Sequence, residues 1–189
     1  MAKRSTRFGF TIVELMFVVV IIGIIASITL VTYRNVQARA RDDRRLADMS
    51  MYVKTLDAYK SFNQTYPVVA YSGLGAQNGW ESSAREAAGQ FLDSLDSIAG
   101  QSSMPVDPTN NANGNDITVD RTNSKFTYVY NYYTAGTNGC DATKGNYYVI
   151  GVLRTETTGA TKIAGSPGFS CTSRDWQSEL SWVTGRFEK

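Results

Sequence analysis

Glu14 is the side chain in this sequence whose position most needs a chemical explanation. It stands at the start of an apolar run, since no charged residue occurs from Leu15 to Val31. An unpaired carboxylate costs roughly 2.5–3.5 kcal/mol at the centre of a bilayer and less near its edge. An acid at this place therefore implies a cationic partner that becomes available once the segment leaves the lipid.

Cleavage of the bond between Gly9 and Phe10 would create such a partner. The new α-amino group of Phe10 would lie four residues before Glu14. In a helical array of identical subunits, the Glu14 carboxylate of one chain can then meet the Phe10 amine of the next. A buried charge is tolerated when paired and penalised when alone, so this ion pair would check the axial register of the array.

The chain offers little for catalysis. It has no histidine, which removes the commonest general base, the usual serine–histidine and cysteine–histidine pairs, and most zinc sites. The glycines from Gly73 to Gly79 miss the dinucleotide-binding spacing by one residue, and no G-x-S-x-G motif is present. We therefore predict a non-enzymatic protein with no cofactor and no metal.

Cys140 and Cys171 are the two cysteines of the chain. Two thiols are too few for a four-thiolate metal site, and behind a membrane-crossing segment they suggest a disulfide in an oxidising compartment. Two unlinked buried thiols are the alternative. A bridge would close a loop of about 31 residues and add roughly 3–4 kcal/mol to stability by the chain-entropy relation.

The distribution of charge argues against a general affinity for phosphate backbones. The whole chain has a net charge of +2, but five arginines and two aspartates from Arg34 to Arg45 give this neck a charge of +3. From Leu46 onward, 11 basic and 14 acidic residues give −3, the wrong sign for bulk binding of nucleic acid. We interpret the neck as a solvated stem, with lipid headgroups or neighbouring subunits as alternative partners.

The opening stretch admits three interpretations. A secretory signal has an apolar core of about 7 to 15 residues, which is shorter than this run, and the A-x-A at residues 38–40 lies well beyond its end. A single-pass anchor fits the length, because roughly 17 to 22 residues at about 1.5 Å each span ~26–33 Å, but it leaves Glu14 unexplained. A segment that is processed and then polymerises explains both features.

The heptapeptide Gly9-Phe10-Thr11-Ile12-Val13-Glu14-Leu15 follows a short basic leader and precedes a long apolar helix. This pattern resembles the prepilin signal of type IV pilins and related pseudopilins, over about the first 55 residues. The resemblance implies a leader, residues 1–9, that a membrane aspartyl peptidase removes before it N-methylates Phe10, with Glu14 as the assembly carboxylate. Val31 stands where many pilins have a proline, which is a departure from the pattern of the family.

The resemblance also implies a function. We expect a structural subunit, as a major pilin, of a type IV pilus used for adhesion, twitching motility or DNA uptake. The implied partners are other copies of the chain, the prepilin peptidase and methylase, an inner-membrane assembly platform with its ATPases, and the lipid bilayer before assembly. The alternatives are a minor pilin or pseudopilin of a type II secretion or competence system, and a membrane-anchored binding protein that never polymerises.

Localisation follows from the same resemblance. The subunit would remain in the cytoplasmic membrane until assembly and then reside in an extracellular pilus on the bacterial cell surface. Nucleic acid is a weaker candidate partner: eleven tyrosines can stack on the bases of single-stranded DNA. Sheet core and subunit packing account for most such residues.

The hydrophobic pattern predicts one long helix that begins at Phe10 and ends before Pro67, which pushes its predecessor out of helical geometry. We assign residues 10–33 to the transmembrane and polymerisation half of this helix and residues 34–62 to an amphipathic half. Residues 63–189 should then form an α+β headpiece, in which the amphipathic half packs on a small antiparallel sheet. Its predicted apolar face consists of Val36, Ala40, Leu46, Ala47, Met49, Val53, Leu56, Tyr59 and Lys60.

Within the headpiece we predict one further helix, from Arg85 to Ile98, and two aromatic, β-branched strands at residues 125–133 and 146–156. Residues 161–164 are a candidate third strand. The predicted cap of the sheet consists of Trp176, Leu180, Trp182, Val183 and Phe187.

The turn-rich stretch 104–116 lies between these elements. Its Asp107, Asn111 and Asp116 supply oxygens of the type that calcium binds, and some pseudopilins bind calcium in a comparable loop. Their spacing fits no EF-hand, and such turns are common without metal, so no metal site is assigned.

Overall fold

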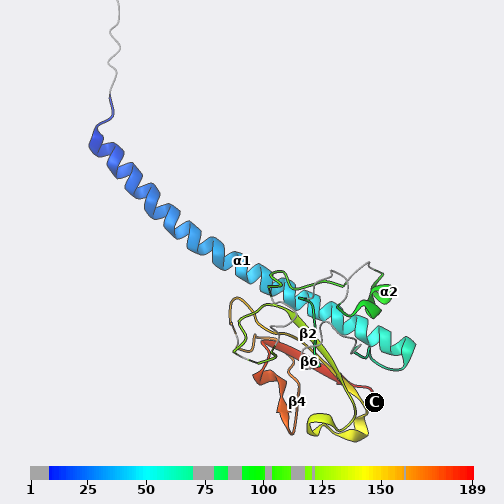
Figure 1. Ribbon diagram of the computed structural model, residues 1–189. Helices are drawn as coiled ribbons and strands as arrows, with labels where there is room; N and C mark the ends of the chain where they lie inside the picture. Colours follow the sequence, from blue (N-terminus) through cyan, green and yellow to red (C-terminus); the bar gives the residue numbers. More distant parts are fainter. Residues whose placement is uncertain are drawn as a thin grey trace, which may run out of the picture. The chain divides into compact units, whose positions relative to one another are not determined.

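The computed structural model describes residues 9–69, 79–84, 91–100, 104–111, 118–120, 122–159 and 161–189. The chain divides into two units, Met1–Arg39 and Ala40–Lys189, and helix α1 (Ile12–Asn63) contributes to both (Figure 1). The other helices are η1 (Asp93–Leu95), α2 (Asp96–Ala99), η2 (Thr137–Gly139), η3 (Ala142–Lys144) and η4 (Trp176–Ser178). The strands are β1 (Glu81–Ser82), β2 (Tyr128–Tyr133), β3 (Tyr147–Val152), β4 (Ser170–Cys171), β5 (Arg174–Asp175) and β6 (Trp182–Phe187).

Helix α1 ends where the sequence predicts. Gln64, just after its last residue, has a positive φ of 64° and donates its backbone N–H to the carbonyl of Lys60 at 2.8 Å. A left-handed residue at this position satisfies an otherwise unpaired helix carbonyl and turns the chain away. Pro67 then prevents any return to helical geometry. The prediction of one long helix is confirmed.

In the first unit, the described apolar side chains of α1 are exposed. The large apolar side chains from Ile12 to Leu30 whose burial is described are between 46% and 79% exposed. The most apolar window of the helix has a mean hydropathy of 2.8, so by length and composition alone α1 can cross a membrane. A surface of this extent needs lipid or other protein to cover it.

In the second unit, four strands form an antiparallel sheet in the order β1-β2-β3-β6. Side chains alternate between its two faces. One face packs against the second half of α1 in a core formed chiefly by Met49, Tyr52, Leu56, Tyr128, Tyr130, Tyr148, Ile150 and Trp182. The opposite face holds a second core formed chiefly by Trp80, Val129, Tyr147, Val149, Trp176, Leu180 and Val183. The predicted α+β architecture is confirmed.

The two predicted strands are confirmed with shorter bounds, as β2 and β3, but the edge of the sheet differs from the prediction. Residues 161–164 form no strand, although Ile163 donates its N–H to the carbonyl of Ser181 at 2.8 Å. The third long strand is β6, which contains three residues that we expected in the cap, Trp182, Val183 and Phe187. Their side chains lie on opposite faces and enter both cores, which a cap on one face could not do.

The prediction of one helix from Arg85 to Ile98 is wrong in the part that the structure describes; residues 85–90 lie outside it. Leu92 has a φ of 52°, which no right-handed helix contains, and its backbone N–H donates to the Glu81 Oε1 at 2.6 Å. The helical residues are η1 followed by the single turn of α2. Burial of Phe91, Leu92 and Leu95 in the core outweighs continuous helix geometry.

The buried face of the second half of α1 is also different from the predicted one. Met49 and Leu56 are buried as expected, whereas Ala47 is exposed. The face continues toward the N-terminus through Arg45 and Asp42, which are 0% and 2% exposed. The interpretation of the charged neck as a solvated stem is therefore wrong for these two residues, because partners in the headpiece pair with them.

Candidate functional site

The residues expected to undergo processing and to direct assembly lie together at the start of α1. Gly9 and Phe10 precede the helix and are exposed, and the Phe10 side chain is 86% exposed. Thr11 follows as the N-terminal cap residue. The Glu14 backbone N–H donates to the Thr11 Oγ1 at 3.2 Å, and the Thr11 N–H donates to the Glu14 Oε2 at 2.9 Å.

This reciprocal pair is a capping box, in which each of two residues satisfies a helix-end N–H of the other. A third contact reinforces it, since the Thr11 hydroxyl donates to the same Glu14 oxygen at 2.8 Å. The T-x-x-E spacing of Thr11 and Glu14 in the sequence signals this role of Thr11, which we did not predict. Within the described residues, the Glu14 Oε1 has no hydrogen-bond partner, so one carboxylate oxygen stays available to a cation.

A second group of charged residues anchors α1 inside the headpiece; we call it the arginine cluster. It consists of Arg41, Asp42, Arg45, Asp107 and Glu156. The Arg45 guanidinium donates to both carboxylate oxygens of Asp107 at 2.8 and 2.9 Å and to the Asp42 Oδ1 at 2.7 Å. Arg41 donates to both oxygens of Glu156 at 2.6 and 2.5 Å. The cluster thus joins α1 to the loops that contain Asp107 and Glu156.

The hydrogen bonds of the cluster change the pKa of its members. Burial acts to raise the pKa of the Asp42 carboxyl, but hydrogen bonds, chiefly from Thr157 and from the Glu156 backbone, outweigh it and hold that pKa below its usual range. The hydrogen bond from Arg41 lowers the pKa of Glu156. Burial acts to lower the pKa of Arg45, but the hydrogen bonds to Asp107 and the negative charge of Asp107 outweigh burial and raise this pKa overall. All three groups therefore stay charged at neutral pH.

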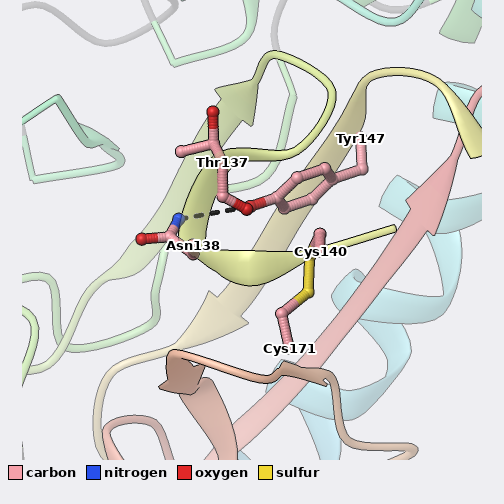
Figure 2. Close-up of a disulfide and its surroundings, with 5 residues drawn as sticks. All are labelled: Thr137, Asn138, Cys140, Tyr147 and Cys171. Atoms are coloured by element: carbon pink, nitrogen blue, oxygen red, sulfur yellow. Dashed lines mark hydrogen bonds between the residues drawn. A yellow bond between two sulfur atoms is a disulfide. The ribbon is translucent and has the colours of Figure 1, made fainter. Parts of the chain in front are cut away.

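Cys140 and Cys171 form a disulfide, with their Cα atoms 4.8 Å apart (Figure 2). The bond joins the segment after η2 to strand β4. Beside it, the Tyr147 hydroxyl donates to the carbonyl of Thr137 at 3.0 Å and accepts from the Asn138 Nδ2 at 3.2 Å. Figure 2 shows the tyrosine ring reaching from β3 toward the η2 residues. The loop that leads into β3 is thereby attached to both sheets.

The hairpin formed by β4 and β5 packs closely on this loop. The Ser173 N–H donates to the Asn138 carbonyl at 3.1 Å. Gly139 has a φ of 73°, and a Cβ placed on it would lie 2.7 Å from the Ser173 Oγ. A larger residue at position 139 is therefore excluded both by the positive φ of the backbone and by the close contact with Ser173. The disulfide and the hairpin make a closed surface element whose tip, Thr172 and Ser173, is exposed.

The oxygens considered as calcium ligands are used within the protein. Both Asp107 oxygens accept from Arg45, and the Asn111 Oδ1 accepts from the Phe126 N–H at 2.8 Å. Asp116 lies outside the described residues. In the part of the chain that the structure covers, no group of three or more acidic, histidine or cysteine residues is arranged to hold a metal ion.

The tyrosines considered for base stacking lie mostly in the two cores. The side chains of Tyr52, Tyr128, Tyr130, Tyr147 and Tyr148 are fully buried. Among the described tyrosines whose exposure is known, only Tyr33, on α1, is well exposed, at 60%. The described tyrosines therefore do not form a stacking surface for nucleic acid, which needs exposed ring faces.

Comparison with known proteins connects the N-terminal site to a family. The prokaryotic N-terminal methylation motif matches residues 4–30. Over 74 residues the chain is 35% identical to type II secretion system core protein G of Dickeya chrysanthemi, a stretch that covers 39% of this chain and 47% of that protein. Over 67 residues it is 36% identical to the protein of the same name in Vibrio cholerae, covering 35% of this chain and 46% of the relative.

The chain spans about half the length of these relatives. No solved structure matches it. The methylation motif, the long helix that follows it and the four-stranded antiparallel sheet are the features that define its class. The chain carries the N-terminal methylation motif and a pilin-like α+β fold, and it is distantly homologous to type II secretion system core protein G, a type IV pilin-like protein.

Proposed function

We propose that this chain is a pseudopilin-like subunit that polymerises through the first half of α1 into a filament of a type II secretion or related system. The observation that carries the proposal is the succession of three features. The methylation motif at residues 4–30 leads into a helix whose apolar side chains are exposed within their own unit, and Glu14 near its start keeps one carboxylate oxygen unpaired in the described structure. A membrane covers this surface before assembly, and other copies cover it afterwards.

Processing after Gly9 is part of the proposal. No atom of the described residues lies within 4 Å of a Cβ placed on Gly9, so packing against the described part of the chain gives no reason for glycine at this position. Recognition by a peptidase with a narrow site supplies one. Removal of residues 1–9 by a prepilin peptidase, followed by methylation, leaves Phe10 as a cationic N-terminus. That amine then neutralises Glu14 of a neighbouring copy during assembly.

The rest of the assembly follows from this role. The mature subunit sits in the inner membrane with its headpiece outside, and a membrane platform with cytoplasmic ATPases extracts it into the growing filament. The chain itself does no chemistry in this cycle. Its headpiece supplies the outer surface of the filament.

A type IV pilus subunit is the second candidate. The observation that favours it is the disulfide-closed element of β4 and β5, whose tip is exposed. Such a surface suits contact with an external target. Deletion of the gene separates the candidates: loss of secreted proteins from the medium indicates a pseudopilin, and loss of long sheared filaments indicates a pilin.

Mass spectrometry of the mature N-terminus tests the class as a whole. A chain that starts at Phe10 with one added methyl group supports processing, membrane export and assembly as described. A mature chain that still starts at Met1 and is found in filaments would contradict the proposed role of the Phe10 amine.

A further inference from the structure

The outer face of α1 in the second unit carries an acid and a base that have no ion-pair partner among the described residues. These are Asp43 and Lys54, and both are exposed. Lys54 follows Asp43 by 11 residues, which is about three helical turns, ~16.5 Å along the axis, and only about 20° around it. The two charges therefore lie on one line of the helix, too far apart to pair with each other.

This line of α1 stands between two hollows. One hollow, of about 450 Å³, is bounded on its far side by Ile98 and Ala99, the last two residues of α2. The other, of about 500 Å³, is bounded by Pro167 and Trp182. Lys54 lines both. An element that docks on this face would find room for its side chains on either side of the helix.

The sequence along the line repeats at the same interval of 11 residues. Ala47 corresponds to Ala58 and Ser50 to Ser61, while Asp43 corresponds to Lys54. A parallel copy displaced by three turns would therefore set small residues against small residues. It would also set an acid against a base, and opposite charges of this kind favour one register over others.

We propose that this face of α1 is an interface with a second copy of the chain, in which Asp43 of one copy pairs with Lys54 of the next. The inference rests on the proposed function, because it names a contact within the same filament. The contact is head-to-tail, because each copy uses Asp43 toward one neighbour and Lys54 toward another. A contact of this kind leaves one unpaired Asp43 and one unpaired Lys54 at the two ends of the array, so it extends into an open array instead of closing a dimer.

Charge reversal tests the pairing in cells that express the full chain with its assembly machinery. Lys54→Glu should lower the yield of sheared filaments about tenfold, because an attraction becomes a repulsion at every contact. Asp43→Lys should do the same, and the double variant Asp43→Lys/Lys54→Glu should recover most of the yield. Lys189→Glu, at another exposed lysine, is the matched control and should leave it unchanged.

Oxidative cross-linking gives a second readout that does not depend on yield. Asp43→Cys/Lys54→Cys should produce a ladder of covalent oligomers in filaments, whereas Asp43→Cys/Ser61→Cys should not. Normal filaments from Lys54→Glu, or a ladder only from the second pair, would overturn the interface while the proposed function stands. Absence of filaments from the wild-type chain would instead overturn the proposed function, and the interface with it.

Discussion

Arg45 and Asp107, 62 residues apart in sequence, face each other through two parallel hydrogen bonds of 2.8 and 2.9 Å, and both side chains are fully buried. The guanidinium also lies over the Phe126 ring, 5.0 Å from its centroid. A bidentate, charge-assisted contact of this type is geometrically specific. It attaches α1 to the loop before β2 in one orientation.

Removal of Arg45 should destabilise the headpiece strongly. Arg45→Met leaves Asp107 and Asp42 as buried carboxylates without their cation, so we expect a loss of about 3–5 kcal/mol in the free energy of unfolding. Urea unfolding of the full chain in detergent, followed by tryptophan fluorescence, measures it. Arg44→Met is the control: this arginine is exposed and lies 3.9 Å from Asp48, so its loss should cost less than about 1 kcal/mol. Equal effects would contradict the structural role of Arg45.

Stability of the headpiece should fall in acid. The carboxyls of Asp42 and Glu156 have lower pKa values in the folded protein than in the unfolded chain, so the unfolded chain binds protons first as pH falls. Their contribution is complete above the unfolded pKa values of about 3.9 and 4.3 and is lost as pH falls through the lower folded values. Asp48, whose pKa burial raises, contributes in the opposite direction.

Urea unfolding at pH 7 and at pH 3 checks this dependence. We expect a lower free energy of unfolding at pH 3, and a smaller difference between the two pH values for Glu156→Gln than for the wild type. A pH difference that is the same in both proteins would show that Glu156 does not contribute to it.

Loss of the disulfide should destabilise the protein by about 3–4 kcal/mol, because the open chain gains loop entropy when it unfolds. Cys140→Ser/Cys171→Ser is the variant, and its thermal midpoint should be compared with that of the wild type with and without reductant. Reductant should lower the midpoint of the wild type toward that of the variant. An unchanged midpoint in the variant would mean that the Tyr147 contacts and the β4–β5 hairpin hold this element without the bond.

Glu14 has two separable roles, as a partner of Thr11 in the helix cap and as the proposed partner of Phe10 in another copy. Thr11→Ala removes the cap at a cost of about 0.5–2 kcal/mol in helix stability but keeps the carboxylate. Glu14→Ala removes both. We expect normal processing of both variants by mass spectrometry, filaments from Thr11→Ala, and none from Glu14→Ala. Equal loss of filaments in the two variants would assign the importance of Glu14 to the cap.

The sequence alone determined the elements that depend on neighbouring residues. The end of α1 was predictable because Pro67 acts on the residue before it, and β2 and β3 were predictable because their aromatic and β-branched residues are consecutive. The N-terminal motif was recognisable for the same reason. Even the capping box, which our sequence analysis missed, has a local signal, since Thr11 and Glu14 are three residues apart.

Tertiary structure alone decided which charges are buried and which strand completes the sheet. Arg45 and Asp42 appear in the sequence as part of a solvated neck, and their burial depends on Asp107 and on the backbone of Glu156, 62 and 114 residues away. The strand of β6 depends likewise on β3, with which it pairs along its whole length. Desolvation of a charge or of a strand edge costs free energy unless a partner compensates for it, and partners at such distances in sequence are set by the fold as a whole.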